Sequence, residues 1–190
     1  MRKVILVVNT TLDGYMAGLN GELDWMVYDP RVHAEAWIEL RDRIDTMLVG
    51  RKAHQGFESH FREQATAPDS PPDLVEFAHW ILDTPKVVFS RTLSAADLSR
   101  SARLAASDIP DEVAALQRQP GKDMLIFGGV SMVQAFIRHG LIDEYWFKVH
   151  PVALGAGLPI FTDLKDRVSL ALTHTTAYDS GLVTLRYRPA

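Results

Sequence analysis

A strand, a glycine turn, a helix and a second strand follow one another between Lys122 and Phe161, and this order constrains the fold more than any other feature of the sequence. The apolar run Met124–Phe127 has the length and the flanking residues of a buried strand. The pair Gly128–Gly129 interrupts the run, apolar residues then recur at helical spacing, and Gly140 is typical of the position after a helix. A second strand is predicted over Glu144–Val149.

The turn at Gly128–Gly129 suits a phosphate group. Without Cβ atoms the backbone can approach a ligand closely, and the helix that follows offers unpaired N–H groups and the positive end of its dipole. A phosphate or pyrophosphate favours such a position. Paired glycines also occur in strand-to-helix turns for steric reasons alone, so a phosphate site and a plain tight turn are both open interpretations.

Composition places the chain among ordinary globular proteins and argues against several kinds of site. Its 190 residues suffice for one sizeable core, so we expect a single domain over residues 1–190. The chain is 47% hydrophobic and 23% charged with a net charge of −4, and it has no basic stripe, which argues against a nucleic-acid partner. No apolar run is long enough for a membrane span or a signal peptide. The absence of cysteine fits a cytoplasmic protein, and the seven histidines lack metal-site spacing, so we expect no metal.

Elsewhere along the chain, short strands alternate with helices. Strands are predicted over residues 3–8, 46–49 and 86–90, with a closing hairpin over residues 170–178 and 182–188. Helices are predicted after the start Asp29–Pro30, from residue 51 with an undefined end, over residues 74–82, and over residues 110–119 with Asp108 as the N-cap; residues 63–73 are predicted to form a loop. The alternation predicts an α/β fold with a mainly parallel central sheet, antiparallel C-terminal strands and helices on both faces.

In sheets of this kind, ligands bind outside the carboxyl ends of the strands. Three of the predicted strands end in residues suited to phosphate: Gly50–Arg51, Ser90–Thr92 and Gly128–Gly129. The sequence therefore predicts a ligand site at this edge of the sheet.

Five segments, in order along the chain, resemble the dihydrofolate reductase-like family. They are TLDGYMAG (residues 11–18), LVGRKAHQGF (48–57), VVFSRTL (87–93), IFGG (126–129) and LIDEYWFKVHPVALGAGLPIF (141–161). Within that family the chain is most similar to the branch containing the C-terminal reductase domain of the bifunctional riboflavin-biosynthesis deaminase-reductase. The resemblance implies a three-layer α/β fold and a reductase that uses NADPH.

The resemblance also implies where NADPH binds. Backbone groups of Asn9, Met16 and Ala17 would hold the nicotinamide. The phosphates and the adenosine would be bound by Gly50, Arg51, Lys52, Ser90, Arg91, Gly128, Gly129, Val130, Ser131 and Met132. Arg51 and Arg91 offer planar forks that suit phosphate oxygens. The pattern departs at Ala53, where a threonine hydroxyl is common in these reductases.

For the substrate, Trp25 lies where relatives place a wall of the pocket, and its ring is suited to stacking on a flat heterocycle. Asp29 is the carboxylate nearest to the position at which dihydrofolate reductases bind the pterin ring. Its place before Pro30 predicts a helix N-cap more strongly. No residue is assigned a catalytic role, because the cofactor carries the chemistry and either water or a pocket carboxylate can supply a proton.

The predicted function is hydride transfer from NADPH to a small heterocyclic or pentose-derived substrate, with a stand-alone riboflavin-pathway reductase as one version of it. The alternative from another class is a nucleotide-binding dimeric module of the same fold without turnover. The apolar strand Glu144–Val149 predicts a two-fold homodimer, unless the closing hairpin covers this strand within one chain.

Overall fold

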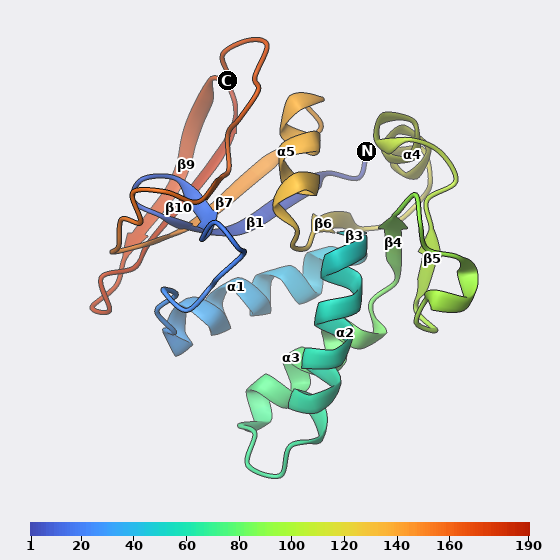
Figure 1. Cartoon of the computed structure of the whole chain (residues 1–190), viewed down its shortest axis with the longest axis horizontal. Coiled ribbons are helices and arrows are strands. Elements are labelled where there is room, and N and C mark those ends of the chain that lie inside the picture. Colours follow the sequence, from blue (N-terminus) through green and yellow to red (C-terminus); the bar gives the residue numbers. More distant parts are fainter. The chain divides into compact units, whose positions relative to one another are not determined.

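The computed structural model describes all of residues 1–190, and the chain packs as two compact units (Figure 1). Unit 1 comprises Met1–Arg2 and Ala34–Gly129, and unit 2 comprises Lys3–His33 and Val130–Ala190. Each unit contributes four strands that lie side by side in a sheet. The expectation of a single domain stays a prediction.

Unit 1 contains a four-stranded parallel sheet with helices on both faces. The strand order is β5 (Ala102–Leu104), β4 (Lys86–Phe89), β3 (Ile44–Gly50) and β6 (Asp123–Ile126), and all three pairings are parallel. The helices are α1 (Pro30–Arg43, in unit 1 from Ala34), α2 (Arg51–Thr66), α3 (Pro72–Asp83) and α4 (Ile109–Gln117), with a short 3-10 helix at Ala95–Asp97. The central strands are buried on both faces of the sheet. Their fully enclosed side chains include those of Met47, Leu48, Val88, Met124 and Ile126.

The predicted starts of α2 and α4 hold in this unit, but the loop predicted between α2 and α3 is too long. Asp108 caps α4 by accepting a hydrogen bond from the Asp111 backbone N–H at 3.2 Å. The loop predicted over residues 63–73 is helical at both ends, since α2 continues to Thr66 and α3 begins at Pro72. Phe61 of α2 packs edge-to-face on Phe77 of α3, with ring centroids 5.6 Å apart, and this contact holds the two helices together across a loop of only five residues, 67–71.

Unit 2 combines one parallel and two antiparallel pairings. Its strand order is β1 (Val4–Thr11), β7 (Glu144–His150), β10 (Val183–Pro189) and β9 (Leu170–Ala177). β1 and β7 are parallel, whereas β10 is antiparallel to both β7 and β9, so the predicted C-terminal hairpin is confirmed. A small second sheet pairs β2 (Tyr15–Ala17) with β8 (Leu158–Pro159), and α5 (Val130–Arg138) follows the glycine pair directly.

The premise of the dimer prediction is wrong, because β7 is not an edge strand. β1 covers one side of it and β10 covers the other. Trp146 and Phe147 point to opposite faces and are both buried, Trp146 beneath the Arg186 guanidinium at 3.8 Å and Phe147 beside Tyr187. The alternative, in which the closing hairpin covers this strand within one chain, is the one observed. The homodimer itself stays a prediction without this support.

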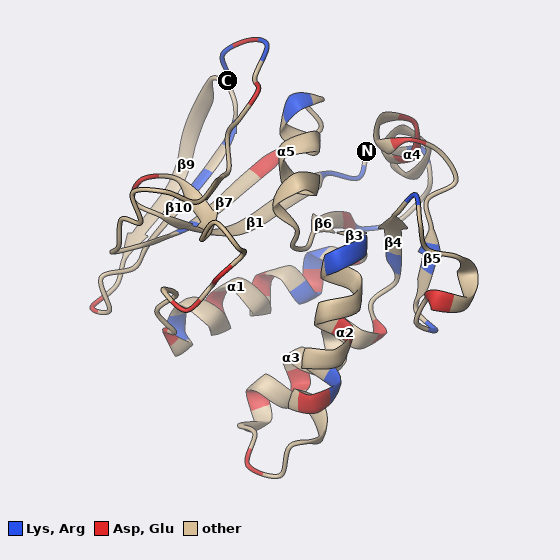
Figure 2. Cartoon of the chain, viewed as in Figure 1, with Lys and Arg blue, Asp and Glu red and all other residues tan.

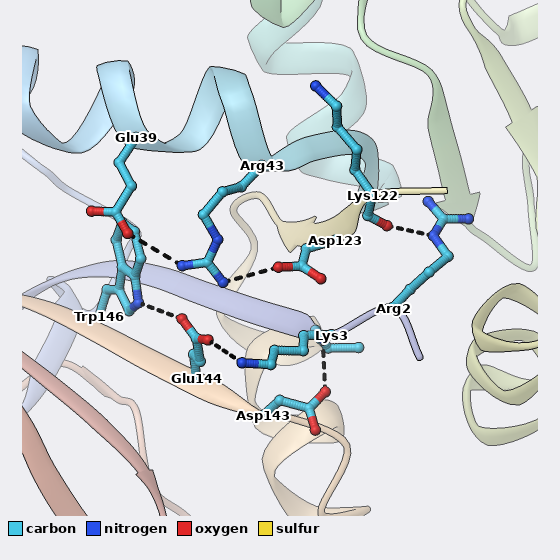
Figure 3. Close-up of polar contacts among 10 residues, drawn as sticks. Arg2, Lys3, Glu39, Arg43, Lys122, Asp123, Asp143, Glu144 and Trp146 are labelled. Atoms are coloured by element: carbon cyan, nitrogen blue, oxygen red, sulfur yellow. Dashed lines mark hydrogen bonds and ion pairs between the residues drawn. The ribbon is translucent and has the colours of Figure 1, made fainter. Parts of the chain in front are cut away.

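Ion pairs secure the amino ends of strands in each unit (Figure 3). In unit 1, Arg43 of α1 binds Asp123 at the start of β6 at 2.9 Å, and Arg2 donates to the Lys122 carbonyl at 2.6 Å. In unit 2, Glu144 pairs with Lys3 at 2.9 Å and accepts from the Trp146 indole N–H at 3.3 Å. These charged residues therefore stabilise the strand starts and leave the carboxyl ends for other roles.

None of the helices combines the length and the apolar character that crossing a membrane requires.

Candidate functional site

The three phosphate-suited segments lie at one edge of the unit 1 sheet. β4, β3 and β6 are neighbouring parallel strands, so their carboxyl ends meet at the same edge. Gly50–Arg51 follows β3, Ser90–Arg91 follows β4 and Gly128–Gly129 follows β6. The sequence prediction of a shared edge is confirmed for these segments.

The first turn of α2 is open to an anion. Gly50 is its N-cap with an extended backbone, so no side chain caps the helix, and no acidic residue lies in the first turn. The first N–H groups of a helix have no partner within the helix and carry the positive end of its dipole. Arg51 and Lys52 are exposed at this start and form no ion pair, and the basic first turn is visible in Figure 2. Arg91, after β4, is also exposed and without an ion-pair partner.

The glycine pair has a structural role that does not depend on a ligand. Gly128 and Gly129 have φ angles of +73° and +85°, a region that other residues rarely adopt. A Cβ atom at Gly128 would also lie 2.3 Å from the Phe57 ring and 3.2 Å from the Ala53 Cβ. The tight-turn interpretation is therefore correct for Gly128, and phosphate binding would be an additional role. Ala53 is itself buried beside this turn.

Two other residues that the sequence predicts to bind the cofactor have side chains with structural roles. The Ser90 hydroxyl accepts from the backbone N–H groups of Thr92 and Leu93 at 3.1 and 3.0 Å, and so shapes the turn after β4. In unit 2, the Met132 side chain is buried in the core below the first turn of α5, where Val130 is half-buried and Ser131 exposed. Any ligand contact of Met132 would therefore come from its backbone.

In unit 2, Asp13 links the loop after β1 to the segment after β7. Its carboxylate accepts from the backbone N–H of Gly155 at 2.7 Å and of Leu154 at 3.2 Å, and from the Thr11 hydroxyl at 2.6 Å. The Thr11 hydrogen bond is the main cause that lowers the pKa of Asp13. These bonds precede β2, which carries Met16, half-buried, and Ala17, buried.

His150, at the end of β7, joins two residues that the sequence assigned to different ligands. Its Nδ1 accepts from the Val27 backbone N–H at 3.0 Å, so the proton of the neutral ring lies on Nε2. Nε2 lies 3.1 Å from Oδ1 of Asn9, to which it therefore donates. The Trp25 ring stands edge-on to the imidazole at 5.2 Å. Asn9, predicted for the cofactor, and Trp25, predicted for the substrate, thus share one neighbour.

The environment of His150 favours its neutral form. Burial is the main cause that lowers its pKa to about 4, and the nearby charge of Lys148 lowers it further. Sequence reasoning missed His150 because no histidine motif surrounds it. The only available signal was its position at the carboxyl end of a strand parallel to β1.

Asp29 has the structural role that its position before Pro30 predicts. Its Oδ1 accepts from the backbone N–H of Arg31 at 2.9 Å and of Val32 at 3.4 Å, which caps α1. Its Oδ2 accepts from the Ser180 hydroxyl at 2.5 Å, and this bond is the main cause that lowers the pKa of Asp29. Both oxygens are therefore engaged, and a substrate role for Asp29 stays a prediction.

The replacement Asp29→Asn separates the two roles. Asparagine caps a helix about as well as aspartate, so we expect the free energy of unfolding to change by less than about 1 kcal/mol. If the carboxylate binds substrate as a charge, KM will rise while the melting temperature hardly changes. Thermal melting and steady-state kinetics of the variant measure both quantities, and a large loss of stability would contradict the capping argument.

The arrangement of strands and helices defines the class of protein to which the chain belongs. The structure is similar to dihydrofolate reductase from Enterococcus faecalis complexed with NADP(H), with a TM-score of 0.59, 12% identity and coverage of 98% of this chain and 96% of the other. It is also similar to a putative riboflavin biosynthesis protein from Shewanella sp. PV-4, with a TM-score of 0.77, 25% identity and 99% coverage of both chains. The fold is the dihydrofolate reductase-like α/β fold, as predicted.

The sequence then places the chain more closely. Residues 2–184 match the RibD C-terminal domain family, and the chain belongs to this family. It is 37% identical over 186 residues to the uncharacterized protein YyaP of Bacillus subtilis, covering 98% of this chain and 94% of that protein. A deaminase/5-amino-6-(5-phosphoribosylamino)uracil reductase from Thermotoga maritima matches with a TM-score of 0.64 and 18% identity, and this chain covers 57% of it.

Proposed function

We propose that the chain is an NADPH-dependent reductase that acts on a small heterocyclic or pentose-derived substrate. The observation that carries the proposal is the carboxyl edge of the unit 1 sheet, where an uncapped helix start lies among cations without ion-pair partners. Arg51 and Lys52 begin α2, and Arg91 follows the adjacent strand β4. Membership in the RibD C-terminal domain family, a reductase type, supports the same reaction class.

The residues at this edge fit the phosphates of NADPH. The free N–H groups of α2 suit a phosphate group, and a guanidinium can bind two phosphate oxygens at once. Arg51, Lys52 and Arg91 would hold the phosphate end of the cofactor, while the backbone of Gly129 and Val130 would approach the pyrophosphate. In unit 2, Asn9, Met16 and Ala17 would border the nicotinamide. When bound, NADPH supplies a hydride, and these residues would orient it toward the substrate.

Cofactor preference tests the proposal. Charge-assisted hydrogen bonds to the extra phosphate should make NADPH bind at least tenfold more tightly than NADH, or about 1.4 kcal/mol. The double replacement of Arg51 and Arg91 by glutamine should remove most of this preference and leave NADH affinity nearly unchanged. Fluorescence titration of both cofactors measures the difference.

Arg118→Gln provides the matched control. Arg118 is exposed in unit 1 as well, but it follows α4 and precedes β6, so it lies toward the amino ends of the strands. Its replacement should leave both affinities unchanged. Equal binding of NADPH and NADH by the wild type would remove the assignment of Arg51, Lys52 and Arg91.

Turnover distinguishes the reductase from a nucleotide-binding module of the same fold. NADPH oxidation should be measured with dihydropteridines, aminouracil ribosides, and nitro or quinone acceptors. Oxidation with one class would identify the substrate class. Tight NADPH binding without oxidation by any acceptor would favour the module.

A further inference from the structure

Lys148 is a half-buried lysine in the middle of the unit 2 sheet, and its ammonium group has no hydrogen-bond or ion-pair partner. Two other lysines of the chain, one of them buried, have polar partners. Buried Lys86 donates to Ser101 Oγ and to the Leu82 and Thr84 carbonyls at 2.9–3.0 Å, and Lys3 pairs with Glu144. Burial alone lowers the pKa of Lys148 to about 8, so the group is still mostly charged at neutral pH.

The strand register gives Lys148 polar neighbours that carry no negative charge. Lys148 is paired with Asn9 on β1 and with Thr184 on β10, and His150 lies two residues further along β7 on the same face. Asn9 Oδ1 already accepts from His150 Nε2, and Asn9 Nδ2 has no hydrogen-bond partner. The register therefore places Lys148 and Asn9 side by side on one face of the sheet, and both the Lys148 ammonium and the Asn9 amide nitrogen are donors without an acceptor.

An uncompensated charge of this kind opposes folding. A half-buried ammonium loses part of its hydration, and here no carboxylate compensates for the loss. A carboxylate or carbonyl oxygen of a ligand, placed between the two donors, would supply the missing acceptor. His150 fixes the orientation of Asn9, because its Nε2–H requires Oδ1 and turns Nδ2 away from the ring.

We propose that Lys148 and Asn9 form a recognition site for a substrate oxygen, either that of a carboxylate or the carbonyl oxygen of an acidic heterocycle that can take up negative charge. The substrate class is thus a small anionic or readily ionised compound rather than a neutral apolar one. That the bound compound is a substrate rests on the proposed function, whereas the binding site itself does not.

The test uses the full chain without cofactor and three probes. Orotate carries both a carboxylate and the carbonyl oxygens of an acidic heterocycle, benzoate carries only the carboxylate, and uracil carries only the carbonyl oxygens. Calorimetry should show that Lys148→Met weakens orotate binding at least tenfold and that Lys148→Arg, which keeps the charge, recovers most of the loss. A matching loss for benzoate identifies the carboxylate as the recognised group, and a matching loss for uracil identifies the carbonyl oxygen of the heterocycle.

The melting temperature provides a second readout, which a structural lysine would move in the opposite direction. Lys148→Met should raise it by at least about 3 °C, because an unpaired half-buried charge is removed. The control Lys3→Met removes a paired lysine from the same unit and should not raise it. A lower melting temperature for Lys148→Met would assign the ammonium a structural role and overturn the proposal.

Unchanged affinity of Lys148→Met for all three probes, or no binding of any probe to the wild type, would also overturn the site. NADPH affinity is measured on the same proteins and should be equal in wild type and variant. A wild type that does not bind NADPH would refute the proposed function and leave the probe results standing, so the two failures are distinguishable.

Discussion

Replacing Gly128 with alanine is expected to lower the free energy of unfolding by about 3 kcal/mol, the sum of a backbone and a packing contribution. The φ angle of +73° disfavours any residue with a Cβ atom. That atom would also lie 2.3 and 2.7 Å from two carbons of the Phe57 ring. Phe57 cannot move away easily, because its ring packs on Phe127 with centroids 4.7 Å apart and on Phe61 at 6.0 Å.

Gly155→Ala is the matched control for this prediction. Gly155 has the same φ angle of +73°, but no atom lies within 4 Å of the position its Cβ would take. It should therefore show only the backbone contribution, about 1 kcal/mol. Urea unfolding of both variants gives the two free energies. Equal losses would mean that the Phe57 contact contributes nothing, and that backbone strain alone explains glycine at position 128.

The second large expected effect is a fall in the free energy of unfolding in mild acid, and His150 causes it. The pKa of His150 is about 4 in the folded chain, below its value of about 6.5 in an unfolded one. The neutral ring is required because Nδ1 accepts from the Val27 N–H. The contribution is therefore complete above about pH 6.5 and is lost as the pH falls toward 4, with a maximum loss of about 3 kcal/mol.

Comparison with His150→Gln isolates this contribution, since the other six histidines and the carboxylates titrate in both proteins. The variant should be less stable than the wild type at pH 7.5, because the imidazole contacts are lost. The difference should shrink as the pH falls from about 6.5 to about 4. Urea unfolding at several pH values measures it. A difference that is constant with pH would show that His150 titrates normally in the folded chain.

His150 also links stability to the candidate site. Protonation would turn Nδ1 from an acceptor into a donor facing the Val27 N–H. His150 would then move, and Asn9, which lies beside Lys148, would lose the contact that orients it. We therefore expect binding of the anionic probes to weaken only as the pH approaches 4, where His150 protonates in the folded chain.

Local signals predicted most elements because the forces behind them are local. Asp108 caps α4 as its position predicted, and the glycine pair separates β6 from α5. The hairpin β9–β10 follows from two alternating segments around a turn. The parallel order of the remaining strands followed from their alternation with helices.

Two errors in the predicted secondary structure had causes in the tertiary structure. Residues 63–66 and 72–73 carry polar and proline signals typical of a loop, yet they belong to helices, because packing of α2 on α3 overrides weak propensities at helix ends. The short strand β5 escaped detection because Ala102–Leu104 has no apolar pattern of its own and forms by pairing with β4.

The sequence by itself determined the order of strands and helices, the turn chemistry at Gly128–Gly129 and the basic start of α2, since each depends on residues that are near one another in the chain. Only the tertiary structure decided that β7 is an interior strand and that Asn9 meets His150, 141 residues away. It also decided that Lys148 lies beside them without an acceptor. Side-chain partners across a parallel sheet depend on register between distant segments, and neither periodicity nor motif spacing records that register.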